Sequence, residues 1–329
     1  MSRLVYATKK FKPATLDVIA DAISICSEYQ AMGFDLTLRQ LYYQFVSRGL
    51  IPNNDREYKR LGSIINDARL AGYLDWDYIV DRTRSLRTVP HWETPADIIR
   101  SAAHSFRMDK WRDQRTQVEV WIEKDALVGV IEGVCQTNDV PHFSCRGYVS
   151  QSEQWAAGQR IFERALRGQR TVVLHLGDHD PSGIDMTRDI RDRLNNFVMY
   201  DSARHLMSEV DVALSKEERH QAVQVALGNW LDDYEPVVQR IALTMDQVEE
   251  FDPPPNPTKL TDARAESYLS EYGQECWELD ALDPVTLSEL IQSSIDEHRD
   301  PDLWEDAVER ERVQRERLAT IASEFSSEA

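Results

Sequence analysis

Residues 171–186 read TVVLHLGDHDPSGIDM, and this stretch predicts the centre of the fold. Its first six residues are mostly apolar, rich in β-branched side chains and followed by turn-forming residues, which is typical of a buried strand. Asp178 and Asp180 come directly after the apolar run. In an extended chain, side chains two residues apart point to the same side. Because ligands of open α/β sheets bind at the carboxyl ends of the strands, both carboxylates are expected at a ligand-binding edge.

The two carboxylates have two interpretations. Adjacent carboxylates repel each other unless a cation lies between them, and oxygen-only ligands suit Mg²⁺. Alternatively, the stretch is a polar turn between a strand and a helix, in which Asp180 or Ser182 is the N-cap of the helix. These residues on their own leave both interpretations open.

Length and composition indicate a globular protein of about two domains. The chain has 329 residues, of which 42% are hydrophobic, with 8 Trp and 12 Tyr. The 4 cysteines are scattered without a Cys-x-x-Cys pair, which predicts reduced thiols and a cytoplasmic location and argues against a zinc site. We expect neither secretion nor membrane insertion, because there is no signal-type segment and no run of about 18 apolar residues.

The net charge of −19 is unevenly distributed along the chain. Residues 1–116 carry a small excess of Lys and Arg, whereas residues 201–329 carry most of the excess of Asp and Glu. A contact with a polyanion is therefore expected in the N-terminal third. The alternative is that the charges only keep the protein in solution.

The first third predicts a winged helix-turn-helix that binds double-stranded DNA. Helical periodicity over 15–32 is followed by a helix from Leu38 with Thr37 as N-cap, a helix over 55–71 and a β-prone stretch at 76–80. The third helix would present basic residues to DNA, namely Arg56, Lys59, Arg60 and Arg69. A strap beside the phosphates would carry Arg82, Arg84 and Arg87. The alternative is a small helical module whose basic side chains are simply solvated.

The middle third alternates strands and helices, which predicts a mostly parallel sheet flanked by helices. The expected elements are strands at 118–122, 140–148 and 171–180 and helices at 127–137, 154–166 and 184–195. The last third is expected to hold a stiff proline-rich loop at 251–257, a strand or turn at 275–280 and helices at 217–230, 285–297 and 301–324. The predicted domain boundaries are 1–95 for the winged helix, 96–115 for a connection, 116–215 for the α/β core and 216–329 for an acidic helical extension.

Glu123 ends one predicted strand and Asp178 and Asp180 end another, which is a three-carboxylate pattern that resembles the Toprim domain. Three segments are similar to the topoisomerase VI A subunit: VEVWIEKDAL, CRGYVS and LGDHDPSGIDM. Trp277–Leu282 resembles a later segment of the same subunit. This resemblance implies that Glu123, Asp178 and Asp180 hold Mg²⁺, which positions and neutralises a phosphodiester. His179, between the two Asp residues, points the other way in an extended chain and is expected to pack.

The segment TLRQLYY at 37–43 resembles the nucleophile segment of the same family, which includes the meiotic double-strand-break transesterase. The resemblance implies that Tyr43 attacks DNA, that Arg39 assists one helical turn away, and that a 5′-phosphotyrosyl enzyme forms in a homodimer with sites shared between subunits. A phenol with a pKa near 10 is a poor nucleophile, and an adjacent guanidinium favours its phenolate. Alternatively Tyr43 is structural; of Tyr42 and Tyr43, only one is expected to point inward, because helix neighbours differ by about 100°.

The expected function is therefore Mg²⁺-dependent cleavage of both DNA strands by a type IIB topoisomerase A-subunit-like transesterase, similar in plan to stand-alone proteins of the Mini-A type. There is no G-x-x-x-x-G-K-[ST] motif, so an ATP-driven cycle would need a separate ATPase partner. One alternative is a hydrolytic Toprim nuclease, as in the Wadjet nuclease subunit, and another is a DNA-binding subunit that is inactive without a partner. A haloacid-dehalogenase-type phosphatase is disfavoured, because Asp180 is followed by Pro-Ser and only Lys216 and Lys259 lie downstream of Lys124.

Overall fold

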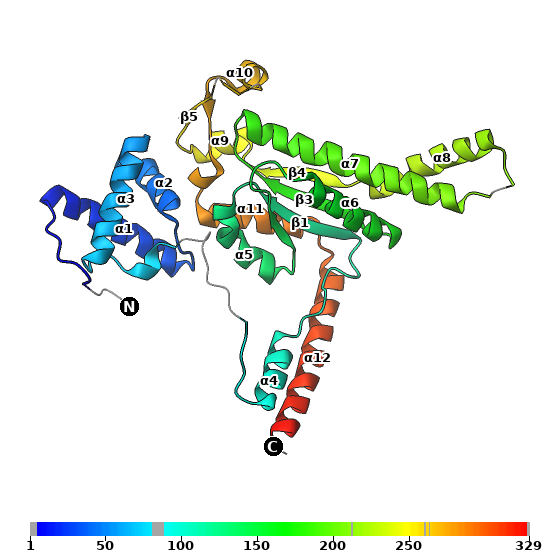
Figure 1. Ribbon diagram of the computed structural model, residues 1–329, viewed down its shortest axis with the longest axis horizontal. Helices are drawn as coiled ribbons and strands as arrows, with labels where there is room; N and C mark the ends of the chain where they lie inside the picture. Colours follow the sequence, from blue (N-terminus) through cyan, green and yellow to red (C-terminus); the bar gives the residue numbers. More distant parts are fainter. Residues whose placement is uncertain (1–4, 81–88, 212, 260, 263, 328–329) are drawn as a thin grey trace.

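A four-stranded parallel sheet lies at the centre of the protein (Figure 1). The computed structural model describes residues 5–80, 89–211, 213–259, 261–262 and 264–327. The strands follow the order β2-β1-β3-β4, and every neighbouring pair is parallel. Their bounds are β1 Thr116–Ile122, β2 His142–Ser144, β3 Arg170–Leu176 and β4 Val237–Ala242. The described part of the chain is thus a mixed α/β fold with twelve α-helices, and its parallel sheet confirms the expectation from the alternating pattern.

Helices cover both faces of the sheet because consecutive strand side chains point to opposite sides. Val118, Val120 and Ile122 of β1 pack in one apolar cluster with α5 (Val128–Thr137) and α11 (Pro284–Asp296). Trp121 lies in the other cluster, with α6 (Gln151–Leu166) and α7 (Pro181–Glu209). The β strands therefore form the middle layer of three.

The order of the strands sets the position of the site. From β1 the chain adds β2 on one side and then β3 on the other, so the direction of winding reverses between β1 and β3. The carboxyl ends of the two strands on either side of such a reversal border a crevice, which is where open α/β sheets bind ligands. Glu123 follows β1 and Asp178 follows β3, so both residues lie at this edge of the sheet.

The N-terminal helices form a separate apolar cluster beside the sheet (Figure 1). They are α1 (Pro13–Ala31), α2 (Leu38–Ser47) and α3 (Asp55–Leu70). Thr37 caps α2 as expected: its hydroxyl accepts from the backbone N–H of Gln40, whose side chain accepts from Thr37 N–H in return. Ala281 of the C-terminal part belongs to the same cluster, so the module is docked on the remainder of the chain.

The β-prone stretch after α3 does not form a wing strand in the described residues. Trp76–Tyr78 is a turn of 3-10 helix, and Ile79 makes a single parallel bridge to Leu36. The expected strand at 76–80 is therefore wrong, because Arg69 donates to the carbonyl groups of Trp76 and Ile79 and holds the chain in a turn. The strap residues Arg82, Arg84 and Arg87 lie outside the described residues.

The fourth strand, β4, was not expected from the sequence. Its neighbour β3 pairs with it from Val172 to Leu176, so part of the predicted acidic extension completes the sheet. The polar residues Gln239 and Arg240 interrupt its apolar pattern, which hides the strand from a test of periodicity. Helix α11 from the same extension covers one face, and therefore the α/β core continues beyond residue 215.

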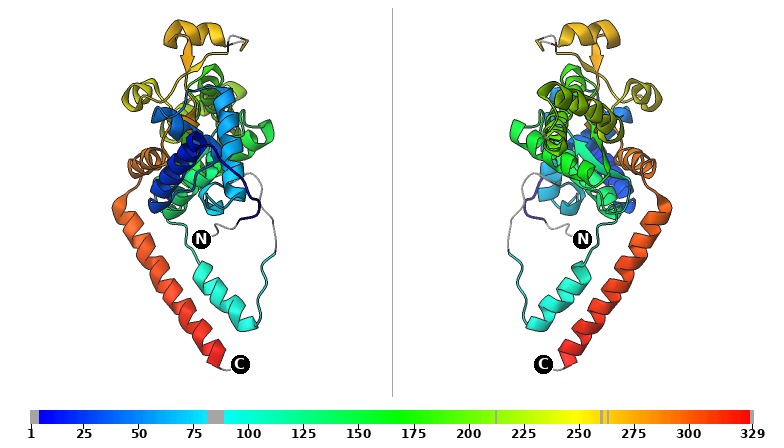
Figure 2. Two further views of the ribbon diagram at one scale, coloured as in Figure 1. Left: turned by 90° about the vertical axis from the view of Figure 1, so that its left-hand side faces the viewer. Right: turned by 90° about the vertical axis from the view of Figure 1, so that its right-hand side faces the viewer.

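Two helical pairs project from this body (Figures 1 and 2). Helix α8 (Lys216–Tyr234) runs back along α7, and α12 (Pro301–Ser327) packs with α4 (Pro95–Ser105) from the predicted connection. The remaining elements are α9 (Met245–Phe251), α10 (Ala265–Tyr272), an antiparallel pair of β5 (Asn256–Pro257) and β6 (Glu275–Cys276), and two turns of 3-10 helix at Asp125–Leu127 and Leu279–Ala281. Within the residues described, no helix has the length and apolar character needed to cross a membrane.

Candidate active site at the carboxyl edge of the sheet

Glu123 and Asp178 lie against each other where β1 and β3 end. The register pairs Ile122 with Leu176, and the N–H of Glu123 donates to Leu176 O over 2.8 Å. The N–H of Asp178 then donates to Glu123 Oε2, also over 2.8 Å. Burial, followed by the charge of Asp178, raises the pKa of Glu123 to about 7. The two acids, of which Asp178 is buried and Glu123 half-buried, thus form a strongly interacting pair, as the pattern of strand ends predicted.

One of the two carboxylate oxygens of Asp180 caps a helix instead of facing Glu123 and Asp178. Its Oδ1 accepts from Gly183 N over 2.7 Å and from Ser182 Oγ over 3.0 Å, so it is the N-cap of α7. The capping alternative for Asp180 is therefore correct. Its charge still contributes to the raised pKa of Glu123, so Asp180 lies near the pair.

Two glycines let the backbone approach this edge closely. A Cβ on Gly183 would lie 2.2 Å from Asp178 O, and a Cβ on Gly177 would lie 3.0 Å from Glu123 Oε2. Arg240 of β4 binds the same loop from behind, with its NH2 donating to Gly177 O over 2.9 Å and to Asp178 O over 2.5 Å. The loop that carries Asp178 is therefore held rigidly by α7 on one side and β4 on the other.

Lys124 links the pair to a third segment, which the sequence alone did not place here. Its Nζ lies 2.9 Å from Asp178 Oδ1, 3.0 Å from Glu278 Oε2 and 3.5 Å from Asp280 Oδ2. Asp178 Oδ1 also accepts from Leu279 N over 2.7 Å. At this acidic edge, three carboxylates, those of Asp178, Glu278 and Asp280, thus surround one ammonium group, and Glu123 adjoins them through its hydrogen bond from Asp178 N. Glu278 and Asp280 could have been predicted as site residues only from the resemblance of Trp277–Leu282 to the family, because that segment contains both acids.

Arg39 reaches the same cluster from α2. Its guanidinium pairs with Glu278 through NH2, and its Nε lies 3.1 Å from Asp280 Oδ2. The ring of Tyr43, one turn later, lies beside it, with 5.9 Å between the guanidinium carbon and the ring centre. A continuous chain of ion pairs therefore joins the predicted nucleophile segment to Asp178 within one molecule.

Tyr42 and Tyr43 are both buried, 4% and 3% exposed, so the expectation that only one points inward is wrong. The apolar cluster around α2 and the docked C-terminal segment enclose both rings. Tyr42 OH receives a hydrogen bond from Asn54 N over 2.7 Å and lies 2.9 Å from Asn53 Oδ1, which gives it a structural role. Both tyrosines line a pocket of about 160 Å³, which Arg39, Asn256 and Glu278 also line, but only Tyr43 lies beside the guanidinium of Arg39.

The pKa of Tyr43 does not shift in the direction expected from the neighbouring Arg39 alone. Burial, followed by the charge of Glu278, raises its pKa, while the neighbouring Arg39 acts in the opposite direction and is outweighed. Because Arg39 is paired with two carboxylates, its charge is largely compensated. In the free protein Tyr43 is therefore a neutral phenol.

The donor set of the acidic edge suits Mg²⁺ held by two protein carboxylates. Glu123 and Asp178 each keep one oxygen that no described residue binds, and Asp280 Oδ1 is buried without a hydrogen-bond partner among those residues. Mg²⁺ usually takes one or two carboxylates and completes its shell with water and substrate phosphate. No three His, Cys, Asp or Glu side chains form a closed metal cage in the described part of the chain. Glu123 and Asp178 are thus the fitting ligands, and Asp180, whose Oδ1 caps α7, keeps its Oδ2 without a partner among the described residues.

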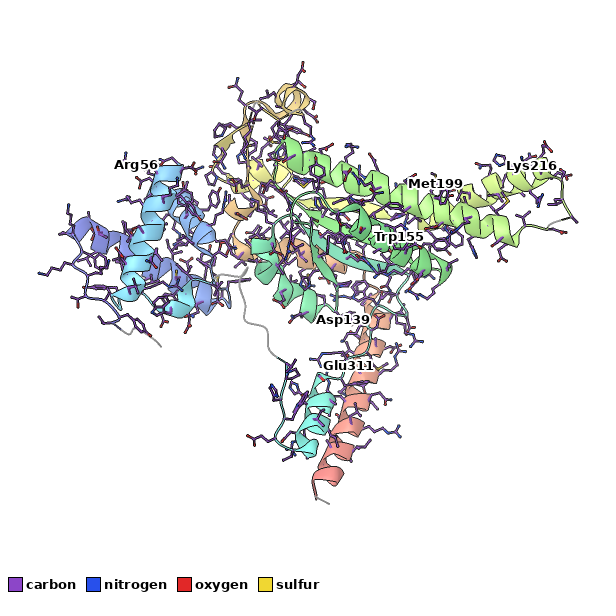
Figure 3. All side chains as sticks on the ribbon, in the orientation of Figure 1. Arg56, Asp139, Trp155, Met199, Lys216 and Glu311 are labelled. Atoms are coloured by element: carbon purple, nitrogen blue, oxygen red, sulfur yellow. The ribbon has the colours of Figure 1, made fainter. Side chains whose placement is uncertain are left out.

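The predicted DNA-contacting residues divide into two groups. Arg56, Lys59 and Arg60 are exposed on α3, and Figure 3 shows Arg56 at the upper end of that helix. Arg69 is half-buried and stacks 4.8 Å above the ring of Trp76 while it binds two carbonyl groups, so it stabilises the module itself.

His179 packs, as expected. Its Nδ1 lies 2.8 Å from the hydroxyl of Tyr268, and its backbone bridges to Trp277.

Comparisons with known proteins add nothing to this geometry: no protein-family model, curated protein or solved structure matches the chain.

Proposed function

We propose that the protein cleaves double-stranded DNA with Mg²⁺ by transesterification, with Tyr43 as nucleophile in a Toprim-type site that follows a winged-helix-type module. The observation that carries this proposal is that Glu278 binds both Arg39 of the nucleophile segment and Lys124 of the acidic edge. Two segments that are far apart in sequence, and that each resemble a catalytic segment of one enzyme family, thereby contact the same carboxylate.

The chain's own residues account for the steps. Tyr43 Oη attacks phosphorus, the bond from phosphorus to O3′ breaks, and the 5′-phosphate remains on Tyr43 while the leaving 3′ oxygen takes a proton from water. Glu278, the carboxylate that acts on the phenol in the pocket, accepts the phenolic proton once Arg39 and Lys124 turn to the DNA, because, against the effect of burial, these two cations lower its pKa in the free protein. Arg39 and Lys124 offer positive charge to the phosphoryl oxygens once DNA competes for them. Mg²⁺ held by Glu123 and Asp178 would neutralise and position the phosphodiester.

A complete site within each chain is part of the proposal. The family resemblance implies sites shared between two subunits, but here Arg39 and the acidic edge of one molecule are already in contact. A homodimer would then place two complete sites on the two strands. A mixture of Tyr43→Phe and Asp178→Ala proteins should stay inactive, whereas recovered cleavage in the mixture would show shared sites.

The main experiment is a denaturing gel of labelled supercoiled plasmid incubated with protein and Mg²⁺. We expect a covalent protein–DNA adduct that Tyr43→Phe abolishes. Tyr42→Phe is the matched control, since it removes the hydroxyl of the neighbouring ring; thermal melts of both variants report folding, because Tyr42 loses its contacts to Asn53 and Asn54. Undiminished cleavage and adduct formation by Tyr43→Phe would disprove the nucleophile.

Hydrolysis by the same metal site is the second candidate, and the burial of Tyr43 favours it. A neutral, buried phenol beside a compensated Arg39 needs a rearrangement before it can attack, whereas a metal-assisted water does not. This candidate predicts free phosphate ends, no adduct, and cleavage that persists in Tyr43→Phe but is lost in Asp178→Ala. A separate ATPase partner would be required only for strand passage.

A further inference from the structure

An arginine-lined pocket opens at the opposite end of the sheet, where β1 and β3 begin. It has a volume of about 800 Å³, and its walls come from the loop before β1 and from the end of α6. Five of its lining residues are Arg112, Arg115, Arg160, Arg164 and Arg167, against only two acids, Asp109 and Asp113. β1 has seven residues, so this pocket lies roughly 20 Å from Glu123 along the strands.

The charges in the pocket are unevenly compensated. Arg160 and Arg164 bind the buried carboxylate of Glu119 beneath the pocket, with contacts of 2.8 Å and 2.5 Å to its Oε1. Asp113 pairs outward with Arg310 over 2.6 Å. Arg112, Arg115 and Arg167 are exposed and form no ion pair with any acidic residue that the structure describes. The pocket thus keeps a positive surplus in a protein whose net charge is −19.

The backbone beneath these arginines is rigidly held. Gln169 Nε2 donates to Arg112 O over 3.0 Å and to Gln114 O over 2.7 Å. Gln114 in turn exchanges two hydrogen bonds with the backbone of Asp300, at 2.9 Å and 2.8 Å. A loop anchored in this way presents its arginines in a fixed arrangement, which lowers the entropic cost of binding an anion.

We propose that this arginine pocket binds the sugar-phosphate backbone of DNA at a second contact, away from the cleavage site. Guanidinium groups suit phosphate oxygens, to which they can donate two hydrogen bonds at once. The lining contains no aromatic or aliphatic side chain on which a base could stack, so it suits a backbone rather than a free nucleotide. The choice of DNA as the polyanion rests on the proposed function, whereas the pocket and its charge do not.

The test is the salt dependence of binding to a labelled duplex, measured by fluorescence anisotropy in EDTA so that cleavage does not contribute. Arg115→Ala/Arg167→Ala removes two exposed charges from the pocket. It leaves Glu119 paired with Arg160 and Arg164. We expect weaker binding and a slope of log affinity against log salt that is smaller in magnitude by about 2. Arg312→Ala/Arg317→Ala removes the same charge from the exposed side of α12 and should leave both quantities unchanged.

Wild-type affinity and slope in the pocket variant, or an equal loss in the α12 variant, would overturn the inference. A third result would also overturn it: calorimetry shows that pyrophosphate binds the wild type, while the pocket variant binds the duplex as the wild type does. The pocket would then hold a small phosphate ligand. Plasmid cleavage with Mg²⁺ is scored separately. If cleavage is absent while the slope still changes, the proposed function fails and the DNA contact stands.

Discussion

Replacing Gly183 by alanine should destabilise the protein, because α7 begins in direct contact with the backbone of Asp178. The new Cβ would lie 2.2 Å from Asp178 O and 3.0 Å from its carbonyl carbon. A side-chain tip could swing aside, but this carbonyl oxygen accepts a hydrogen bond from the buried Arg240. Relief of the overlap must therefore move either the helix or the loop that carries the Asp178 carboxylate.

The magnitude follows from two opposing effects. Alanine in place of glycine favours a helix by up to about 1 kcal/mol. Overpacking of a close contact costs typically about 1–3 kcal/mol, and the overlap with a backbone atom places this change at the upper end. We therefore expect a net loss of about 2 kcal/mol in the free energy of unfolding, together with reduced cleavage.

Gly133→Ala is the matched control, measured by the same urea titration followed by circular dichroism. Gly133 lies within α5, and a Cβ there meets nothing within 4 Å, so alanine should raise stability by roughly 0.5–1 kcal/mol. Equal midpoints for the two variants would refute the close approach of α7 to Asp178 and, with it, the account of how that carboxylate is positioned.

Two further predictions concern buried ionisable groups away from the pocket of Tyr43. Burial alone would raise the pKa of Glu119, but hydrogen bonding and charge from Arg160 and Arg164 hold it at about 2. The ionised Glu119 therefore stabilises the fold above pH 4.5, and this stabilisation is lost as the pH falls towards 2. Glu119→Gln should lower the free energy of unfolding by about 3–5 kcal/mol and flatten the acid dependence of thermal melts. Burial, then the charge of Arg240, lowers the pKa of His175 to about 3, so the unfolded chain binds the proton first as the pH falls below 6.5. His175 should therefore contribute about 1.4 kcal/mol per pH unit to the fall in unfolding free energy below pH 6.5, beside a similar contribution from His179, whose pKa burial lowers to about 4. His175→Gln should reduce the slope in urea titrations by about that amount, and an unchanged slope would contradict the buried neutral imidazole.

Local chemistry was sufficient to predict most of the elements. The apolar run before Asp178 predicted β3 and Thr37 predicted the start of α2, because strands and helix caps depend on neighbouring residues. The sequence leaves the cap of α7 open between Asp180 and Ser182, and the helix expected over 184–195 spans Pro181–Glu209. The meeting of Glu123 and Asp178 also followed from the sequence, since residues that end parallel strands gather at one edge of the sheet. The edge strand β4 was missed because Gln239 and Arg240 break its pattern.

The partners of those residues depended on the tertiary structure. Glu278 and Asp280 join Lys124 and Arg39 only because the chain returns to the sheet edge after α10, and no local signal specifies that return. The same docking buries Tyr43 beside Tyr42 and compensates Arg39, so the pKa of Tyr43 is raised, although an adjacent guanidinium was expected to favour its phenolate. The sequence therefore determined which groups stand at the strand ends and on α2. Only the packing of distant segments decided which charges face one another, because ion pairing and desolvation depend on distance in space rather than along the chain.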